Sequence, residues 1–376
     1  MAMPRTAARL LVDCLVEQGC DRLFTVPGES FLPVLDALFD CRPIHTVTCR
    51  HESGAAFMAA ADGALTGRPG IAFVTRGPGA TNASIGVHLA RQDSLPLILF
   101  VGDVARPMRE REGFQEIDFP ALFAPLAKWA ARIEDARRIP EYVARAYATA
   151  ISGRAGPVVL ALPEDMLAEP ACGIAPRPRV SRPAQAPAPE AMAQLALMLD
   201  QARAPIAIVG GPGWTDAARR DFAHFAEQRG LPVAAAFRRQ DAISPASPVF
   251  AGPLGLGADP RLVERVARAD LVLAVGTRLA DVTTNGYTLL SPDHPGQHLV
   301  HVHPDPGELG RIYRTDLAIC ADTPSFADSV RALPSCSAGA AHDAADCHRT
   351  WQEWSAPPPT PQADPDLAWW MHLARA

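Results

Sequence analysis

Short apolar runs alternate with amphipathic stretches through the first half of the chain. This order is typical of β-α-β units built around a parallel sheet. The apolar runs predict strands at 22–26, 44–49, 70–75, 97–101 and 157–161. The amphipathic stretches predict helices at 6–18, 31–39, 52–63, 83–91 and 140–152.

The same alternation recurs in the second half of the chain. It predicts strands at 205–209, 231–235, 271–275 and 298–303, and helices at 215–230 and 259–269. The two halves share this pattern but no sequence repeat of fixed period. We therefore predict an α/β protein with two doubly wound parallel-sheet domains.

Prolines mark the expected domain boundaries. The chain has 37 prolines in 376 residues, about twice the usual ~5%. A Pro-rich linker is predicted at 171–189, between domains at 1–170 and 190–332. A second Pro-rich linker, 333–365, precedes residues 366–376, which have the pattern of a helix that opens a further domain.

Charge and composition exclude several classes of protein. The formal net charge is −6 and Lys128 is the only lysine, so we expect no nucleic-acid partner. The apolar runs are far shorter than the ~20 residues that span a bilayer. The N-terminus lacks a signal-peptide pattern, and eight cysteines include no Cys-x-x-Cys pair. We expect a cytoplasmic protein with no membrane partner, no disulfide framework and no metal site.

The densest run of unusual residues is Thr75-Arg76-Gly77-Pro78-Gly79-Ala80-Thr81-Asn82. It follows an apolar strand and precedes an alanine-rich helix. Glycines there let a backbone approach a ligand closely, and the start of the helix favours negative charge. A plain strand-to-helix turn, with glycine for its dihedral angles and Thr or Asn for capping, explains the same residues. The run matches neither a Walker loop nor GxGxxG, so it does not by itself predict phosphate binding.

Glu52 is the second candidate. It lies where an apolar strand ends and an alanine- and glycine-rich helix begins. An acid at a helix start is stabilised by the macrodipole by ~0.3–1 kcal/mol, which needs no ligand. However, open α/β sheets bind their ligands at the carboxyl ends of their strands. Two further stretches, Val26-Pro27-Gly28-Glu29 after the first strand and Gly113-Phe114-Gln115-Glu116 in a polar loop, have the character of turns or loops when taken alone.

Taken together, these stretches resemble the thiamine-diphosphate-dependent enzymes of the acetolactate synthase large-subunit group. The resemblance covers the whole first segment in register and continues more weakly into the second. It rests on VPGE at 26–29, RHE at 50–52, TRGPGATNA at 75–83, ARQDSLPLILFVGDV at 90–104, FQEIDF at 114–119, GRAGPVVLALPEDM at 153–166 and GTRLADVTTNGYTL at 276–289. It implies a pyrimidine-binding domain followed by a Rossmann-like central domain.

The resemblance also implies roles for individual residues. Glu52 would hydrogen-bond N1′ of the cofactor's aminopyrimidine, and so promote loss of the C2 proton of the thiazolium. Phe114 and Gln115 would face the 2-oxo acid substrate and the reacting carbon. His88 and Gln92 are expected first at a subunit interface. The aminopyrimidine half of thiamine diphosphate would be lined by Val26, Pro27, Gly28, Thr75, Pro78, Gly79 and Asn82.

The reaction implied is carboligation or decarboxylation of a 2-oxo acid. Acetolactate synthases usually carry a second glycine where this chain has Glu29, so the acyl acceptor stays open. Enzymes of this group hold Mg²⁺ and the diphosphate in a third domain through Gly-Asp-Gly and a later Asn, a pattern that the chain lacks. We therefore expect a truncated chain, or one half of a split enzyme whose diphosphate-binding domain comes from a separate chain. Alone it should bind the cofactor weakly.

Two further questions stay open at this point. The alternative to an enzyme is a non-catalytic relative that dimerises or binds a partner, and the helix at 52–63 is the expected contact in a homodimer or homotetramer. FAD is a second cofactor candidate, because Gly210-Gly211-Pro212-Gly213 and Gly276-Thr277-Arg278 lie where the group has its nucleotide domain. Neither stretch matches GxGxxG, which disfavours NAD. His301 and His303 lack a third ligand, and indicate a turn at a sheet end rather than a metal site.

Overall fold

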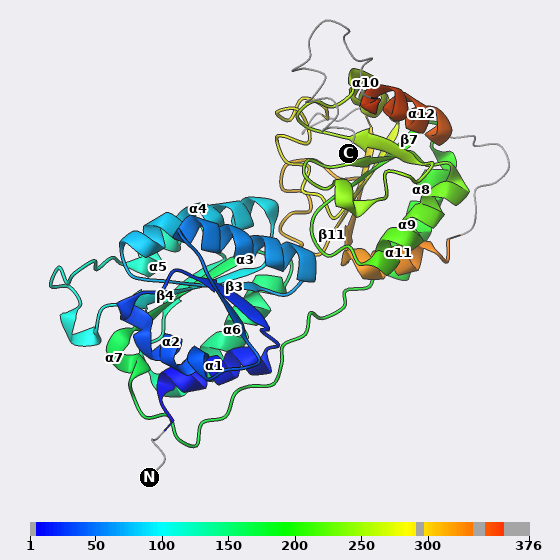
Figure 1. Ribbon diagram of the computed structural model, residues 1–376. Coiled ribbons are helices and arrows are strands. Elements are labelled where there is room, and N and C mark those ends of the chain that lie inside the picture. The colour runs from blue at the N-terminus through cyan, green and yellow to red at the C-terminus, as the bar shows by residue number, and fades with distance from the viewer. Residues whose placement is uncertain (1–4, 291–296, 334–342, 357–376) are drawn as a thin grey trace, which may run out of the picture. The chain divides into compact units, whose positions relative to one another are not determined.

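The computed structural model describes residues 5–290, 297–333 and 343–356 (Figure 1). The chain divides into two compact units, Met1–Pro183 and Ala184–Ala376, and each is described by itself. All of the predicted segment 366–376, and most of the predicted linker 333–365, lie outside the described residues. Where that linker is described, it contains a helix, α12 (Ala344–Ser355), rather than an irregular connection.

A six-stranded parallel sheet forms the centre of the first unit, in the order β2-β1-β3-β4-β6-β5. Its strands are β1 (Arg22–Thr25), β2 (His45–Thr48), β3 (Gly70–Val74), β4 (Leu97–Asp103), β5 (Trp129–Arg132) and β6 (Pro157–Pro163). Its helices are α1 (Ala7–Glu17), α2 (Leu32–Phe39), α3 (Glu52–Thr66), α4 (Pro78–Asp93), α5 (Phe119–Phe123), α6 (Ile139–Ile151) and α7 (Glu164–Leu167).

Alternate residues of the strands face two separate layers of helices in this unit. Ile71 and Phe73 of β3 pack with α1, α2 and α6 in one core cluster. Ala72 and Val74 of the same strand pack with α3, α4 and α5 in the other. Figure 1 shows these helices on the two faces of the sheet. The sheet is therefore doubly wound, as the alternation of apolar and amphipathic segments predicts.

Glycines let α3 lie unusually close to the sheet and to α4. A Cβ on Gly70 would lie 1.7 Å from the carbonyl oxygen of Ala59, and a Cβ on Gly86 would lie 2.4 Å from the Cβ of Ala56. Real Cβ atoms do not approach their neighbours so closely, because carbon atoms prefer separations of about 3.5–4.0 Å. The small residues of α3 and α4 thus set the distance between the two helices.

The second unit has the same architecture, with a parallel sheet in the order β12-β11-β10-β7-β8-β9. Its strands are β7 (Pro205–Val209), β8 (Val233–Ala235), β9 (Phe250–Pro253), β10 (Leu271–Val275), β11 (His298–His303) and β12 (Leu317–Cys320). Its other helices are α8 (Pro189–Gln201), α9 (Asp216–Arg229), α10 (Pro260–Ala267) and α11 (Thr323–Val330). The predicted fold class, two doubly wound parallel-sheet domains, is confirmed.

Several elements were missing from the sequence-based prediction. The structure adds the edge strands β5, β9 and β12, the short helices α5 and α7, and the helices α8, α11 and α12. Helix α4 also begins at Pro78, five residues before the predicted start at 83. Within the described ranges, no helix is both long and apolar enough to cross a membrane.

Candidate functional site

The candidate residues gather where β2, β1 and β3 end. These three strands are neighbours and run parallel, so their carboxyl ends share one edge of the sheet. Val26, Pro27 and Gly28 follow β1, Glu52 opens the helix after β2, and Thr75 follows β3. The order of the strands therefore brings together segments that lie far apart in the sequence.

The turn after β1 packs directly onto the end of β3. A Cβ on Gly28 would lie 2.6 Å from the Cβ of Thr75, so no larger residue fits there without a shift. The hydroxyl oxygens of Ser30 and Thr75 lie 2.9 Å apart and share a hydrogen bond. The close contact with Thr75 thus requires glycine at position 28. Thr75 is held by this contact and by its hydrogen bond to Ser30.

Glu52 lies half-buried at the first position of α3. The imidazole of His51 caps this helix by accepting a hydrogen bond from the backbone N–H of Ser53, at 3.2 Å. Asn82 of α4 donates its side-chain N–H to Oε2 of Glu52, at 3.0 Å. The other carboxyl oxygen, Oε1, lies 3.4 Å from where a Cβ on Gly79 would be. One oxygen of Glu52 is therefore bound to α4, and the other faces the first turn of that helix.

The glycine run forms the start of α4. Gly77 has a left-handed φ of 48° and Pro78 is the first helical residue. A Cβ on Gly79 would lie 2.8 Å from Cγ2 of Thr75. A Cβ on Gly77 would lie 2.7 Å from the carbonyl oxygen of Gln115. The run thus contacts the strand end on one side and the loop that carries Gln115 on the other.

The structure brings some predicted residues together more closely than others. Five of them form the connected set just described, and Gln115 joins it through Gly77. The five are Gly28, Glu52, Thr75, Gly79 and Asn82. Val26 is half-buried, and Pro27 and Pro78 are exposed, at the same edge of the sheet. The side chain of Phe114 is 71% exposed beside Gln115. These positions are geometric findings, and the role of each residue stays a prediction.

An ion-pair cluster around the buried side chain of Arg76 at this edge was missed by sequence reasoning. Arg76, whose side chain is only 9% exposed, donates to Glu29 at 3.0 Å and to Glu164 at 2.9 Å. It therefore ties the turn after β1 to the start of α7. Glu29 was noted only as a departure from the acetolactate synthase pattern. The sequence held one signal for this cluster: Arg76 lies inside the glycine run, and the acids Glu29 and Glu164 each follow another strand.

The set around Glu52 fits the aminopyrimidine of thiamine diphosphate in chemistry. The ring carries a nitrogen, N1′, that needs a partner able to hold or share a proton, and a carboxyl is such a group. Asn82 bonds Oε2 of Glu52, so Oε1 is the oxygen from which this contact would be made. The part of the chain that the structure describes contains no cluster of three His, Cys, Asp or Glu side chains that could hold a metal ion.

In the second unit, the glycine stretches proposed for FAD pack against the protein's own backbone. A Cβ on Gly211 would lie 1.9 Å from the carbonyl oxygen of Gly276, so this glycine accommodates the protein's own backbone. The buried Trp214 donates its indole N–H to Gly210 O, at 2.9 Å. A separate cleft of about 300 Å³ is lined on one side by the loop from β9 into α10, with Leu254 and Val263, and on the other by the segment after β10, with Val282 and Thr283. FAD binding stays a prediction.

Two family profiles match the chain. One, described as the thiamine pyrophosphate enzyme N-terminal TPP binding domain, covers residues 5–122, and the other, the central domain of the same enzymes, covers residues 192–330. Together they cover most of both units. The N-terminal profile includes the edge of the first sheet at which the candidate residues gather.

The curated relatives of the chain include acetolactate synthases. The chain is 31% identical to the acetolactate synthase of Mycobacterium bovis over 84% of this chain and 51% of the relative. It is 31% identical to the acetolactate synthase of Bacillus subtilis over 85% of this chain and 55% of the relative. It is 30% identical to the acetolactate synthase isozyme 3 large subunit of Escherichia coli over 93% and 62%. The chain thus spans about half to three fifths of the length of these relatives.

Proposed function

This chain belongs to the thiamine pyrophosphate enzyme family, and on that basis we propose that it takes part in carboligation or decarboxylation of a 2-oxo acid. The observation that carries the proposal is the placement of Glu52, with one carboxyl oxygen bound by Asn82 and the other facing the start of α4. The bound cofactor supplies the electron sink that decarboxylation of a 2-oxo acid requires.

Glu52 holds a proton against N1′ of the aminopyrimidine in this proposal. The hydrogen bond from Asn82 restricts rotation of the carboxyl, so that Oε1 is presented to the ring. Gly28, Thr75 and Gly79 form the closely packed surface beside it, and Val26, Pro27 and Pro78 complete the lining. Gln115 and Phe114 face the substrate, and the exposure of Phe114 leaves it accessible to a 2-oxo acid.

Mg²⁺ and the diphosphate belong, in this proposal, to a diphosphate-binding domain outside the two described units, and a separate chain is one source of that domain. The support is the resemblance to acetolactate synthase large subunits, whose third domain has this task. Mixing the chain with a candidate diphosphate-binding chain, thiamine diphosphate and Mg²⁺ tests it by titration calorimetry. Tighter cofactor binding by the mixture than by either chain supports the assignment, and equal binding contradicts it.

Replacing Glu52 tests its assignment in the assembled holoenzyme, which here means the chain together with a diphosphate-binding domain, thiamine diphosphate and Mg²⁺. Glu52→Gln keeps the size of the side chain but removes the carboxyl, so we expect release of CO₂ from pyruvate to fall at least a hundredfold, within the range usual for acid–base groups. Asp62→Asn is the matched control, because Asp62 is a half-buried carboxylate of the same helix outside the candidate set. Unchanged CO₂ release by Glu52→Gln would contradict the assignment.

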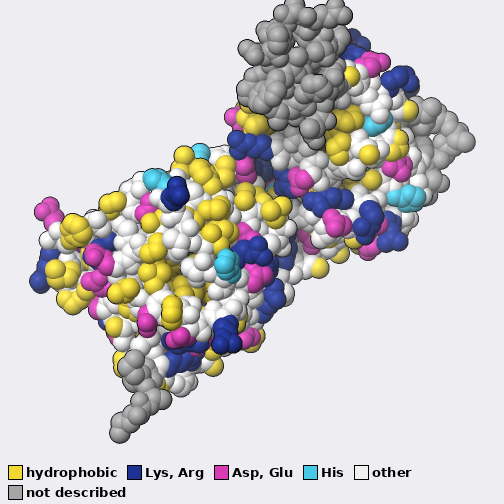
Figure 2. Space-filling model, in the orientation of Figure 1, with side chains coloured by type: hydrophobic (Ala, Val, Ile, Leu, Met, Phe, Trp, Pro, Cys, Tyr) yellow, Lys and Arg dark blue, Asp and Glu magenta, His cyan; other side chains and the backbone are white. Residues whose placement is uncertain are grey.

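A homodimer or homotetramer is the assembly that the surface of the first unit favours. Four large apolar side chains of α3 and α4 are exposed: Phe57, Met58, Leu65 and Ile85. Figure 2 shows hydrophobic side chains gathered over this part of the unit. Contiguous exposed apolar surface is typical of interaction sites. Light scattering should give at least twice the 40.1 kDa of the chain, and Leu65→Glu with Ile85→Glu should return it to a monomer.

The same exposed apolar surface supports a second candidate function. In it, the chain is a non-catalytic relative that dimerises or binds a partner through α3 and α4. The two functions differ in their dependence on Glu52. A scaffold needs the apolar residues but not the carboxyl. Loss of catalysis in Glu52→Gln with unchanged assembly therefore favours the enzyme, whereas a wild-type holoenzyme without turnover favours the scaffold.

FAD is proposed as a second ligand of the central domain only on the resemblance to acetolactate synthases. A flavin absorbs visible light, so the absorbance spectrum of the purified chain tests this directly. A visible flavin band that survives gel filtration supports FAD binding, and its absence after incubation with excess FAD contradicts it.

A further inference from the structure

The loop between β4 and α5, residues 104–118, carries Phe114 and Gln115. Three of its non-glycine residues have left-handed backbones: Glu110 at φ 61°, Glu112 at φ 54° and Gln115 at φ 63°. This conformation costs L-residues roughly 1–2 kcal/mol each. Other contacts must therefore hold the loop in this shape.

The carboxylate of Glu116 makes such contacts inside the loop. Oε1 accepts the backbone N–H of Glu110 and Oε2 accepts the backbone N–H of Gly113, both at 2.8 Å. The backbone N–H of Glu116 donates in turn to the carbonyl of Gly113, at 2.9 Å. These bonds from backbone N–H groups lower the pKa of Glu116, so the carboxylate is charged at neutral pH. The loop is thus folded around one anionic side chain.

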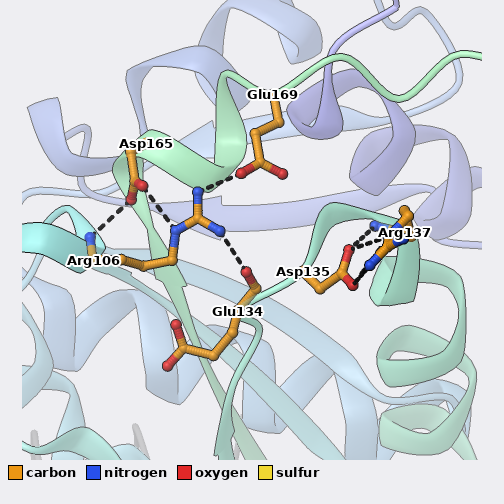
Figure 3. A network of polar contacts seen from close by, with 6 residues as sticks. All are labelled: Arg106, Glu134, Asp135, Arg137, Asp165 and Glu169. Atoms are coloured by element: carbon orange, nitrogen blue, oxygen red, sulfur yellow. Dashed lines mark hydrogen bonds and ion pairs between the residues drawn. The ribbon is translucent and has the colours of Figure 1, made fainter.

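The base of the loop is fixed separately, by Arg106. Figure 3 shows its side chain between Asp165 and Glu169, with a further bond to the carbonyl oxygen of Glu134. The backbone N–H of Arg106 also donates to Asp165, at 2.9 Å. This network anchors the first turn of the loop to α7 and to the segment after β5. The tip, residues 110–116, is organised by Glu116.

The folded tip places Gln115 on the start of α4. A Cβ on Gly77 would lie 2.8 Å from the Cβ of Gln115, so the two residues are in direct contact across the edge of the sheet. Gly77 immediately precedes the helix that carries Asn82, the partner of Glu52. The backbone conformation of Gln115 is therefore held by the hydrogen bonds that Glu116 makes to Glu110 and Gly113.

We propose that Glu116 is a positioning residue, which holds Gln115 against the glycine run so that its side chain can face the substrate. The inference rests on the proposed role of Gln115 and adds a residue to which no role has been given. Glu116 acts through the backbone of the loop. In Glu116→Gln, the amide oxygen can still accept one of the two backbone N–H groups. The amide NH₂ would face the other backbone N–H group, and two donors repel each other.

Proteolysis of the 376-residue chain tests the first part of the inference. Glu116→Gln should make trypsin cleave after Arg109 about tenfold faster, since one charge-assisted bond to the backbone is lost and replaced by a repulsive contact. Glu112→Gln is the matched control, because it removes the same charge from an exposed position of the same loop. Equal cleavage rates for Glu116→Gln, Glu112→Gln and wild type would overturn the inference.

A double-mutant cycle in the assembled holoenzyme tests the second part. Glu116→Gln should lower kcat/KM for the 2-oxo acid about tenfold and leave the Kd of thiamine diphosphate unchanged. On a Gln115→Ala background, the same substitution should lower kcat/KM no further. Additive losses would overturn the inference and show that Glu116 acts independently of Gln115. A fully active Gln115→Ala would instead refute the proposed role of Gln115, whatever the proteolysis shows.

Discussion

Gly86→Ala probes the close contact between α3 and α4. The substitution would place a Cβ 2.4 Å from the Cβ of Ala56 and 3.0 Å from its carbonyl carbon. Inside a helix, alanine is normally better than glycine by ~1 kcal/mol. Overpacking of this kind costs about 1–3 kcal/mol, and the backbone contact puts it at the upper end. We therefore expect a net destabilisation of about 2 kcal/mol.

Gly54→Ala is the control for this substitution. Gly54 lies in α3, the helix that Gly86 of α4 contacts, but a Cβ on Gly54 would meet nothing within 4 Å. It should stabilise the unit by ~0.4–1 kcal/mol, because alanine restricts the unfolded chain. The two variants should thus differ by about 3 kcal/mol in the free energy of unfolding. Urea denaturation, read by hydrogen–deuterium exchange of peptides from β3 and α4, measures this difference in the first unit alone.

The contact also matters for the site. Asn82 lies one helical turn before Gly86 on the same face of α4. Separation of the helices by about 1 Å would lengthen the 3.0 Å bond from Asn82 to Glu52 beyond hydrogen-bonding range. A Gly86→Ala variant that is as stable as Gly54→Ala would refute the reasoning, because it would show that α3 and α4 do not pack as closely as described.

Three other predictions concern buried charges and thiols. Burial and the neighbouring His301 lower the pKa of His303 from 6.5 to about 4, so the stability it contributes is complete above pH 6.5 and is lost as the pH falls toward 4. Thermal unfolding should show a loss of roughly 3 kcal/mol over this range, reduced in His303→Gln. Arg132 pairs with Asp103, which is fully buried, and whose pKa is raised by that burial. Arg132→Met should cost ~3–5 kcal/mol in chemical denaturation, and Arg132→Met with Asp103→Leu should recover most of it. Iodoacetamide at pH 8 should label the exposed Cys172 well before Cys20, because burial raises the pKa of that thiol to about 12; equal labelling would contradict this.

The fold was predictable from sequence where strands are buried on both faces. β3 and β4 are wholly buried, and their continuous apolar runs identify them. The edge strand β5 is only half-buried along its length, so its sequence, Trp-Ala-Ala-Arg, carries no such run. β12 alternates buried and exposed residues over only four positions. Short edge strands depend on pairing with their neighbours more than on their own pattern.

The site was predictable to the extent that strand order determines it. Glu52 and Thr75 each follow a strand, and parallel neighbours bring such residues together. The pairing of Arg76 with Glu29 and Glu164 depends on how the turns after β1 and β6 fold, which their residues alone do not specify. The bonds of Glu116 likewise depend on the left-handed residues of its loop. Contacts of this kind become visible only in the folded structure.

The exchange of the C2 proton of bound thiamine diphosphate tests the central claim most directly. It isolates activation of the cofactor from substrate binding and from later steps, and proton NMR in D₂O follows it after rapid quenching with acid. We predict that Glu52→Gln slows this exchange in the holoenzyme at least a hundredfold, while Asp62→Asn retains the wild-type rate. An unchanged rate in Glu52→Gln, with the cofactor bound as in wild type, would contradict the assignment of Glu52.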